Sequence, residues 1–389
     1  MSANTGAWRA GAVVIGLLLL WRIITVNAVL YGDDGRPRFY SSASAVDEPA
    51  LAAMLRDNPA EVAALLVLGQ ERERRGDAAG AALAFQSAAR IAPLDRDALT
   101  MSSAFFLRQR LIPDALAQLD RLVEGYGEHD KVFPVFAQLL AAREPGMQAI
   151  VSRDPAWLGA FIVDACRRGT DAVLLAPLLQ RRAAAGRLQQ AEVECVTARL
   201  RAAGKWDVAY QAWLNTLPRE RLANVGFVFN GSFEYEPSGT GFDWRPAAGT
   251  ERELGHAVVF ASADSGAGKR ALRVSYSGKR QTVPAVEELI AVPPGRYVLT
   301  GLVRLDQLNS VRGLQWTLRC AAPQGQGRTL ASTERFLGGS EWRPFSLAVA
   351  VPPDCPAQLL ALEPVGLNEG TTFVSGTAWF DDLRMTRAR

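Results

Sequence analysis

The chain has few of the side chains that most often build metal centres and catalytic triads. It contains two histidines, His129 and His256, and four cysteines in 389 residues. Two histidines this far apart in the sequence exclude a multi-histidine metal centre and leave few candidates for a histidine-based triad. The cysteines do not have the spacing of metal ligands.

An excess of charge of either sign is also absent. The 43 basic and 40 acidic side chains give a formal net charge of +3. Nucleic-acid binding requires a concentrated basic stripe, so the charge pattern predicts no nucleic-acid partner.

Recognisable catalytic motifs are missing from the sequence. It has no nucleophile elbow and no phosphate-binding glycine loop. Glu287 and Glu288 are adjacent, but neighbouring residues on a strand point to opposite faces, so they do not form a catalytic dyad. We therefore expect a protein that is not an enzyme. A glycan-processing enzyme is kept as an alternative, because the two carboxylates of a glycosidase can come from distant positions.

An apolar segment stands near the N-terminus. Between Ala10 and Leu30 the only charged residue is Arg22. The segment is long enough to cross a bilayer, which takes about 20 residues, and it predicts a transmembrane anchor within residues 1–31. The alternative is a signal peptide that is cleaved after Val26-Asn27-Ala28. Both interpretations place most of the protein outside the cytoplasm.

A polar segment and then a helical pattern follow. Residues 32–49 contain Gly and Ser without any period, which is typical of a linker. Over residues 50–222 the chain is rich in Ala and Leu with a 3.6-residue period that Pro and Gly interrupt, and this predicts short helices joined by tight turns.

Two of the expected helix pairs carry a repeat with a 34-residue offset. Small residues let two helices approach closely, and an aromatic residue fills the gap to the next pair. The matched positions are Leu65, Leu68, Gly69, Ala81, Phe85, Ala88 and Pro93 in the first unit and Ser103, Ala115, Leu119 and Leu122 in the second. Residues 62–129 thus resemble the tetratricopeptide repeat family. The resemblance implies an α-solenoid with a groove for a protein partner, although such a stack can also be a spacer without a ligand.

Helical periodicity ends near Pro218–Asn224, and period-2 alternation replaces it in residues 224–389. Alternating runs of this length, separated by turns rich in Gly and Pro, predict a β-sandwich. The expected strands are Ala271–Tyr276, Arg296–Leu305, Gly313–Cys320, Trp342–Val351, Gln358–Leu362 and Thr377–Met385.

Short motifs in this region follow a characteristic order. They are Asn230–Glu234, Trp244, Gly268–Val274, Pro294–Gly301, Trp342–Phe345 and Asp381–Leu383. Their order and spacing resemble the jelly roll of carbohydrate-binding modules, the galactose-binding-like sandwich. The resemblance implies a multidomain chain, α then β, in which a transmembrane helix and a solenoid precede a jelly-roll β-sandwich that contacts glycan.

The opening and closing motifs of this region each contribute a carboxylate. First and last strands lie close together in sandwiches of this type, so the resemblance implies that Glu234 and Asp381 meet and hold a structural calcium ion. Period-2 alternation groups Asp381 with Trp379 and Leu383 on the face expected to point inward. The alternative is that the two carboxylates cap strands or pair with Arg384 and its neighbours.

Sugar binding requires exposed aromatic rings with polar groups beside them. Trp244 lies in a Gly/Pro-rich loop between Asp243 and Arg245, which makes these three residues the first candidates for a glycan site. Tyr276, at a strand end, is the second. Alternation places Trp316 and Trp342 in the core.

The four cysteines divide evenly between the two regions. Cys166 and Cys195 fall in the helical part, and Cys320 and Cys355 in the β part, so each part can close one disulfide in an oxidising compartment. Four buried free thiols are the alternative.

These features together predict a non-catalytic adaptor of a bacterial exopolysaccharide or envelope-glycan pathway. It is expected at the inner membrane as a single-pass protein with its bulk in the periplasm, or secreted if the signal is cleaved. Its expected partners are a membrane-embedded or periplasmic protein of polysaccharide assembly, and polysaccharide itself. The rival hypothesis is a pure assembly scaffold that touches no sugar. The pathway rests on analogy between accessory proteins.

Overall fold

The computed structural model describes residues 30, 48–222, 225–321, 326–366 and 372–388. Within these residues, no helix has the length and apolar character needed to span a membrane. The segment that predicts the anchor, residues 10–30, lies outside the described residues except for Leu30.

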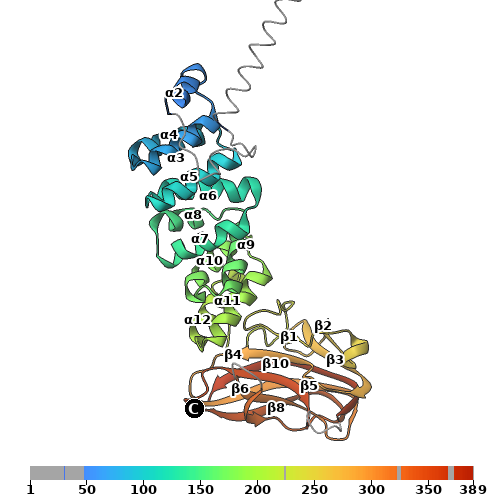
Figure 1. The fold of residues 1–389 in the computed structure, drawn as a ribbon. Coiled ribbons are helices and arrows are strands. Elements are labelled where there is room, and N and C mark those ends of the chain that lie inside the picture. Colours follow the sequence, from blue (N-terminus) through green and yellow to red (C-terminus); the bar gives the residue numbers. More distant parts are fainter. Residues whose placement is uncertain (1–29, 31–47, 223–224, 322–325, 367–371, 389) are drawn as a thin grey trace, which may run out of the picture. The chain divides into compact units, whose positions relative to one another are not determined.

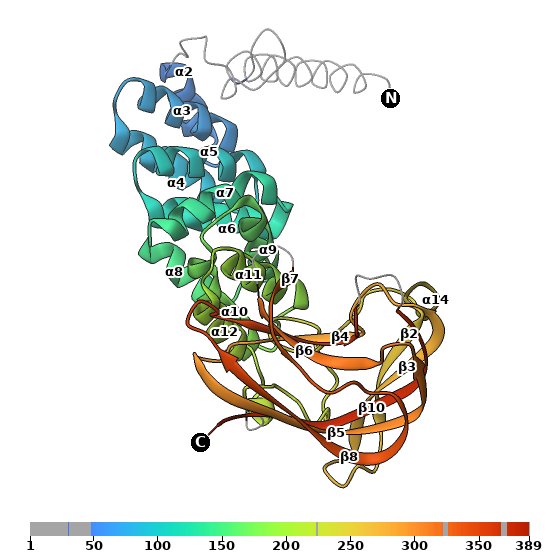
Figure 2. The same cartoon turned by 90° about the horizontal axis from the view of Figure 1, so that it is seen from below.

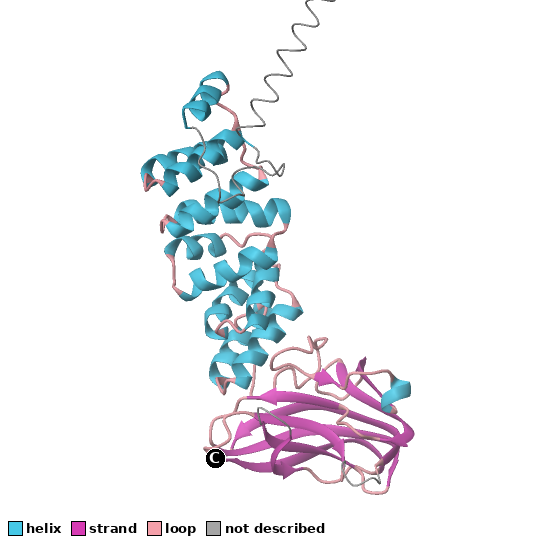
Figure 3. Ribbon diagram, viewed as in Figure 1, coloured by secondary structure: helices cyan, strands magenta, loops and turns pink. Residues whose placement is uncertain are grey.

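The chain divides into two compact units, residues 1–157 and 158–389. The first unit is helical in its described part (Figures 1 and 3). Its helices are α2 (Glu48–Asp57), α3 (Val62–Arg74), α4 (Ala78–Ile91), α5 (Arg96–Arg108), α6 (Ile112–Tyr126), α7 (His129–Ala141) and α8 (Pro145–Ser152).

The helical hairpins α3/α4 and α5/α6 pack through the positions that carry the repeat. A Cβ added at Gly69 would lie 3.0 Å from the ring of Phe85, so the two helices of the first hairpin approach closely there. The Phe85 ring in turn packs on Phe105 of the next hairpin, with 4.8 Å between the ring centroids. The small residue and the aromatic thus join one hairpin to the next.

The second unit combines helices with all the strands. Its helices are α9 (Leu158–Arg168), α10 (Ala172–Ala184), α11 (Gln190–Ala202), α12 (Trp206–Leu214), α13 (Arg219–Leu222) and α14 (Glu251–Leu254). A disulfide between Cys166 and Cys195 links α9 to α11. The secondary structure changes class after Leu222, as the sequence predicts, but compact packing groups α9–α12 with the sandwich.

Two antiparallel five-stranded sheets form the β-sandwich (Figure 2). One has the order β1-β4-β9-β6-β7 and the other β2-β3-β10-β5-β8. The strands are β1 (Arg245–Pro246), β2 (His256–Ser262), β3 (Arg270–Arg280), β4 (Val286–Ile290), β5 (Gly295–Ser310), β6 (Leu314–Ala321), β7 (Gln326–Ser332), β8 (Gly338–Val351), β9 (Gln358–Pro364) and β10 (Phe373–Arg387).

The six strands expected from alternation are confirmed as β3, β5, β6, β8, β9 and β10. Alternation did not reveal β1, β2, β4 and β7. Strand β4 puts Glu288 on a buried position, which breaks the apolar pattern, and β1 has only two residues. A second disulfide, Cys320–Cys355, ties the end of β6 to the segment before β9.

Aromatic rings fill the space between the sheets. Trp316 packs edge-to-face on Trp244 at 5.6 Å and on Phe380 at 5.3 Å, so that rings from three separate segments meet. Such pairs add about 0.5–1.5 kcal/mol beyond the burial of their area. The prediction that Trp316 belongs to the core is confirmed, because it is fully buried.

Strand β10 contains a β-bulge that reverses its alternation. Asp381 pairs with Leu302 and Arg384 with Thr300, so one extra residue lies between two neighbouring pairs, and Asp382 has a φ of 52°. Before the bulge Ala378 and Phe380 are buried in the core, and after it Leu383 and Met385 are. An extra residue shifts every later side chain to the other face.

The opening motif of the β region meets this bulge. The Leu383 N–H donates to the Gly231 carbonyl at 2.8 Å. The opening segment is a turn rather than a first strand, with positive φ at Asn230 and Phe233. The two ends of the sandwich are therefore joined at the irregular point of β10.

Gly231→Ala tests this junction. A Cβ at Gly231 would lie 1.9 Å from the Leu383 carbonyl oxygen, so the backbone must shift, and we expect a loss of about 1–3 kcal/mol in the free energy of unfolding. Urea unfolding measures it.

The matched control is Gly125→Ala in α6, where a Cβ meets nothing within 4 Å. This control is expected to gain about 0.5–1 kcal/mol from helix propensity. Equal effects of the two substitutions would contradict the close approach at Gly231.

Candidate functional site

A row of tryptophan and arginine side chains crosses the outer face of the sheet β2-β3-β10-β5-β8. Arg273 of β3 pairs with Trp379 of β10, and Trp379 pairs with Arg304 of β5. Trp342 of β8 lies beyond Arg304. We call these four residues, Arg273, Trp379, Arg304 and Trp342, the Trp-Arg row. Inward neighbours such as Val274 and Phe380 are buried, so alternation puts the row on the outer face.

Cation–π contacts hold the Trp-Arg row together. The guanidinium carbon of Arg304 is 4.6 Å from the ring centroid of Trp379 and 5.7 Å from that of Trp342. Arg273 lies 5.5 Å from the Trp379 ring on the other side. Each contact is worth about 0.5–1 kcal/mol at an exposed site. The row is thus a continuous, half-buried surface across four strands.

Polar groups border the Trp-Arg row. The Asp306 carboxylate accepts a hydrogen bond from Trp379 Nε1 at 2.9 Å. It also forms an ion pair with Arg304 at 3.1 Å. In the next row of the sheet, Thr377 Oγ1 and Ser275 Oγ lie 3.3 Å apart. The Trp342 indole N–H has no hydrogen-bond partner among the described residues. Aromatic surface, cationic donors and hydroxyl groups therefore lie side by side.

The prediction that Trp342 belongs to the core is wrong. Phe345, Leu347 and Val349 are buried, and period 2 puts even-numbered positions of β8 on the opposite face. Because Trp342 is an even-numbered position of β8, the alternation by itself assigns it to the outer face. Arg273 and Arg304 are polar residues within apolar strands, and this likewise indicates outward-facing positions. Trp379 was less accessible to sequence reasoning, because period-2 alternation groups it with Leu383, whereas the bulge between them puts the two side chains on opposite faces.

Trp244 and Tyr276 do not form an exposed platform, so this prediction is wrong. Trp244 is 0 % exposed, and its indole N–H donates to the Asn230 carbonyl at 3.3 Å. The turn at Asn230–Phe233 folds the Gly/Pro-rich loop inward, which the composition of the loop did not reveal. Tyr276 is buried on the inner face of β3 beside His256, and burial raises the pKa of its hydroxyl.

The flanking candidates Asp243 and Arg245 have different surroundings in the structure. Asp243 is buried and accepts hydrogen bonds from Ser238 and from the Trp244 N–H, so it holds a loop rather than a ligand. Burial raises the pKa of its carboxyl. Arg245 is half-buried in β1 and pairs with Glu287 at 3.3 Å. Arg245 also borders a cavity that it shares with helices α11 and α12.

Glu234 and Asp381 lie close enough to influence one another. Glu234 Oε1 accepts from the backbone N–H groups of Lys269 and Arg270 at 2.7 and 3.2 Å. Asp381 accepts from the Ser265 hydroxyl and, at 2.6 Å, from the Asp382 N–H. Burial raises the pKa of Asp381, and the charges of Asp382 and Glu234 raise it further.

The bulge also corrects the expected orientation of Asp381. It shares a face with Trp379, as predicted, but this is the outer face of the sheet, and Leu383 lies on the inner one. Loop residues that include Ser265 bury Asp381 there. Within the described residues, no group of three or more His, Cys, Asp or Glu side chains is placed to hold a metal ion.

Glu288 is a buried carboxyl that sequence reasoning passed over. Its Oε1 accepts from the Phe229 N–H at 2.7 Å, while Oε2 has no partner among the described residues. Burial raises the pKa of Glu288 well above its usual value, and the charge of Asp243 raises it further. Burial raises the pKa of Tyr210 in α12, and the charge of Glu288 raises it further.

Comparison with known proteins gives likeness in structure alone. No family model matches the sequence, and no curated protein matches it either. A solved CBM4 structure has 15% identity and a TM-score of 0.31, covering 41% of this chain and 99% of that chain. The CBM22-1 xylan-binding domain from Paenibacillus barcinonensis Xyn10C has 14% identity and a TM-score of 0.30, covering 41% and 92%. TmCBM61 in complex with β-1,4-galactotriose has 17% identity and a TM-score of 0.24, covering 44% and 100%.

Glu288 predicts a pH dependence of stability. Because its folded pKa is raised, its contribution to stability is complete below the ordinary glutamate pKa of 4.5 and is lost as the pH rises through the folded pKa. Glu288→Gln cannot ionise, so its free energy of unfolding relative to the wild type should increase from pH 5 to pH 8. Urea unfolding across this range tests it, and parallel pH profiles would contradict a buried neutral carboxyl.

Proposed function

We propose that this protein is a non-catalytic glycan-binding protein and that its β-sandwich contacts polysaccharide through the Trp-Arg row. The observation that carries the proposal is that each residue of the Trp-Arg row contacts the next one across the outer face of one sheet, in the order Arg273, Trp379, Arg304, Trp342. Aromatic rings offer apolar surface to the C–H patches of pyranose rings, and neighbouring donors take the hydroxyl groups.

The dimensions of the row suit a chain rather than a single sugar. Neighbouring strands lie about 4.7–4.9 Å apart, so four strands span roughly 14–15 Å. The contacts within the row keep its side chains in place before a ligand arrives, which lowers the entropy lost on binding. Asp306, Ser275 and Thr377 lie beside it as partners for hydroxyl groups.

The helical part has a separate role in this proposal. We assign its hairpins to tetratricopeptide-like repeats that dock a partner protein of polysaccharide or envelope assembly. Two hollows in the first unit support docking, one of about 590 Å³ between α6 and α8 and one of about 320 Å³ between α4 and α6. Arg121 borders both. Together with an N-terminal anchor, this makes the chain an adaptor on the periplasmic side of the bacterial inner membrane.

A pure scaffold is the second candidate function, and one observation favours it. The segment before β1 packs against helices of the same unit: Arg201 of α11 donates to the Gly241 carbonyl at 3.3 Å, and Trp213 of α12 packs on Phe242 at 5.7 Å. Helices α11 and α12 also line a cavity together with β1, β4 and β9 of the β1-β4-β9-β6-β7 sheet. The Trp-Arg row lies on the opposite sheet, which is why glycan binding is preferred.

Trp379→Ala and Trp342→Ala test the glycan proposal. Loss of a platform ring is expected to weaken binding of the intact protein to a polysaccharide array at least about tenfold, since it removes both apolar surface and the contact that positions Arg304. Binding isotherms to the best array polysaccharide measure the loss.

Phe373→Ala is the matched control for this experiment. Phe373 is an aromatic residue at the start of β10, the strand that carries Trp379. Its side chain is 56 % exposed and lies outside the Trp-Arg row. It should bind polysaccharide like the wild type. Absence of polysaccharide binding in the wild type, or equal loss in the control, would favour the scaffold.

We further propose that Glu234 and Asp381 hold a structural calcium ion. Asp381 is fully buried and its pKa is raised by burial, with Asp382 and Glu234 adding like charge, so a divalent cation would offset an unfavourable arrangement. Calcium takes six to eight oxygen ligands, and the two carboxylates would supply part of that set, with backbone carbonyls or water completing it.

Calcium removal tests this site. At a hundredfold excess over the dissociation constant, calcium should stabilise the protein by about 2.7 kcal/mol, seen as a fall in the melting temperature on adding EDTA. Asp381→Asn should abolish the response, while Asp306→Asn, which changes an exposed carboxylate of the same sheet, should keep it. A wild-type melting temperature that EDTA leaves unchanged would refute the proposal.

A further inference from the structure

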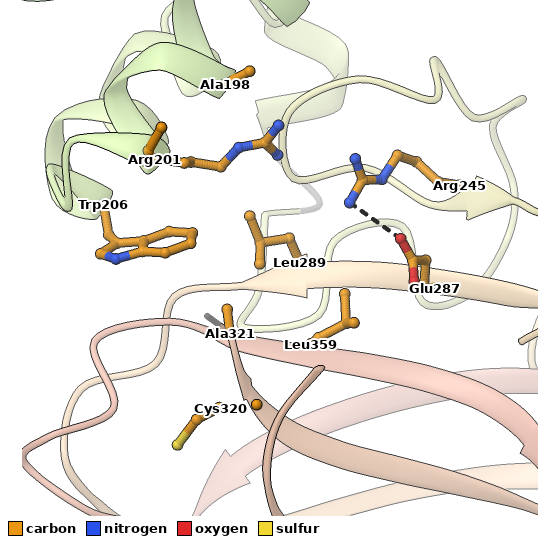
Figure 4. A pocket seen from close by; sticks show the side chains of 11 residues that line it. Ala198, Arg201, Trp206, Arg245, Glu287, Leu289, Cys320, Ala321 and Leu359 are labelled. Atoms are coloured by element: carbon orange, nitrogen blue, oxygen red, sulfur yellow. Dashed lines mark ion pairs between the residues drawn. The ribbon is translucent and has the colours of Figure 1, made fainter. Parts of the chain in front are cut away.

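A cavity lies between the end of the helical part and the β1-β4-β9-β6-β7 sheet, opposite the face that carries the Trp-Arg row. Its volume is about 300 Å³. Helices α11 and α12 contribute one wall and strands β1, β4 and β9 another (Figure 4). The side chains that the argument uses are Arg201, Trp206, Arg245, Glu287, Leu289 and Leu359. All belong to the second compact unit.

Two guanidinium groups face one another across this cavity. Figure 4 shows the Arg201 and Arg245 side chains extending toward each other from opposite walls. The charged side chains lining the cavity are these two arginines and Glu287, so the lining carries an excess of one positive charge. Like charges at close range, partly withdrawn from water, favour an anion between them.

The present partners of the arginines leave binding capacity unused. Arg201 has single contacts of 3.3 Å with the Gly241 carbonyl and with Glu194. Arg245 has a single contact of 3.3 Å with Glu287, and its buried Nε has no hydrogen-bond partner among the described residues. Neither pair is the short, two-bond arrangement in which a guanidinium grips a carboxylate most firmly.

The burial of Arg201 also favours an anion beside its guanidinium. Burial lowers the pKa of its guanidinium, and the charge of Arg245 acts in the same direction, against the pull of Glu194 and Glu287. A second carboxylate arriving between the arginines would offset both effects.

The rest of the cavity is apolar and of monosaccharide size. Trp206 is buried below Arg201, and Leu289 and Leu359 form the floor (Figure 4). Ligand cavities run from about 300 to 1,000 Å³, so this one is at the small end. An indole beside aliphatic side chains suits the C–H surface of a pyranose ring.

We propose that this cavity binds a hexuronate, the carboxylate-bearing unit of an acidic polysaccharide. Arg201 and Arg245 take the carboxylate, and Trp206 with Leu289 contacts the sugar ring. The inference rests on the proposed role in glycan binding, but it uses different residues on the other sheet. It makes the glycan an acidic one, bound at two separate places.

The test is calorimetric titration of the intact protein with glucuronate and galacturonate, with glucose, galactose and inorganic phosphate as comparison ligands. A uronate should bind more tightly than its neutral counterpart and than phosphate, and its affinity should fall as salt is added. Arg201→Gln and Arg245→Gln should each weaken uronate binding at least about tenfold, as expected for loss of a charge-assisted hydrogen bond.

Two further variants make the outcome decisive. Glu287→Gln removes the competing carboxylate and should strengthen uronate binding, whereas a site for neutral sugar hydroxyls would lose affinity. Trp379→Ala changes the opposite face and should leave uronate binding unchanged, so this site and the Trp-Arg row can fail independently. Equal affinity for neutral sugars, tighter binding of phosphate, or no effect of the arginine variants would overturn the proposal.

Discussion

The β-bulge in β10 is the constraint on which the sandwich depends. One extra residue between the pairs Asp381–Leu302 and Arg384–Thr300 changes which face each side chain meets. It turns Leu383 into the core and directs the Leu383 N–H away from the ladder toward Gly231, whereas Trp379, which precedes the bulge, faces outward. The buried Asp381 and the junction of the sandwich's two ends thus meet at one irregularity, which directly follows the half-buried Trp-Arg row in β10. Bulges often occur where a strand must re-aim side chains.

The outer faces of the two sheets meet different surroundings. The segment before β1 packs against α12, where Trp213, Phe242 and Phe229 form an aromatic contact. The β2-β3-β10-β5-β8 sheet keeps its outer face for the Trp-Arg row. A small cavity with two arginines lies between α11, α12 and the β1-β4-β9-β6-β7 sheet, on the side of the sandwich away from the Trp-Arg row. In our proposal both surfaces serve one acidic polysaccharide.

Sequence reasoning succeeded where burial follows a regular period. Strands β5 and β8 alternate over most of their length, and Trp316 lies in the core as expected. It failed where the period breaks. Trp244 was expected on the surface because its loop is rich in Gly and Pro, yet the turn at Asn230 brings it into the core. The Trp-Arg row was missed because its members come from four strands, and only pairing across the sheet brings them together.

The sequence by itself determined the order of a helical region and a β region, the even division of the cysteines and most strands, because these depend on local periodicity and composition. The tertiary structure alone decided which aromatics are exposed, since a single extra residue reverses a face. It also decided that Arg201 and Arg245 share a cavity although 44 positions separate them (245 − 201). Packing between distant segments has no period from which it can be read.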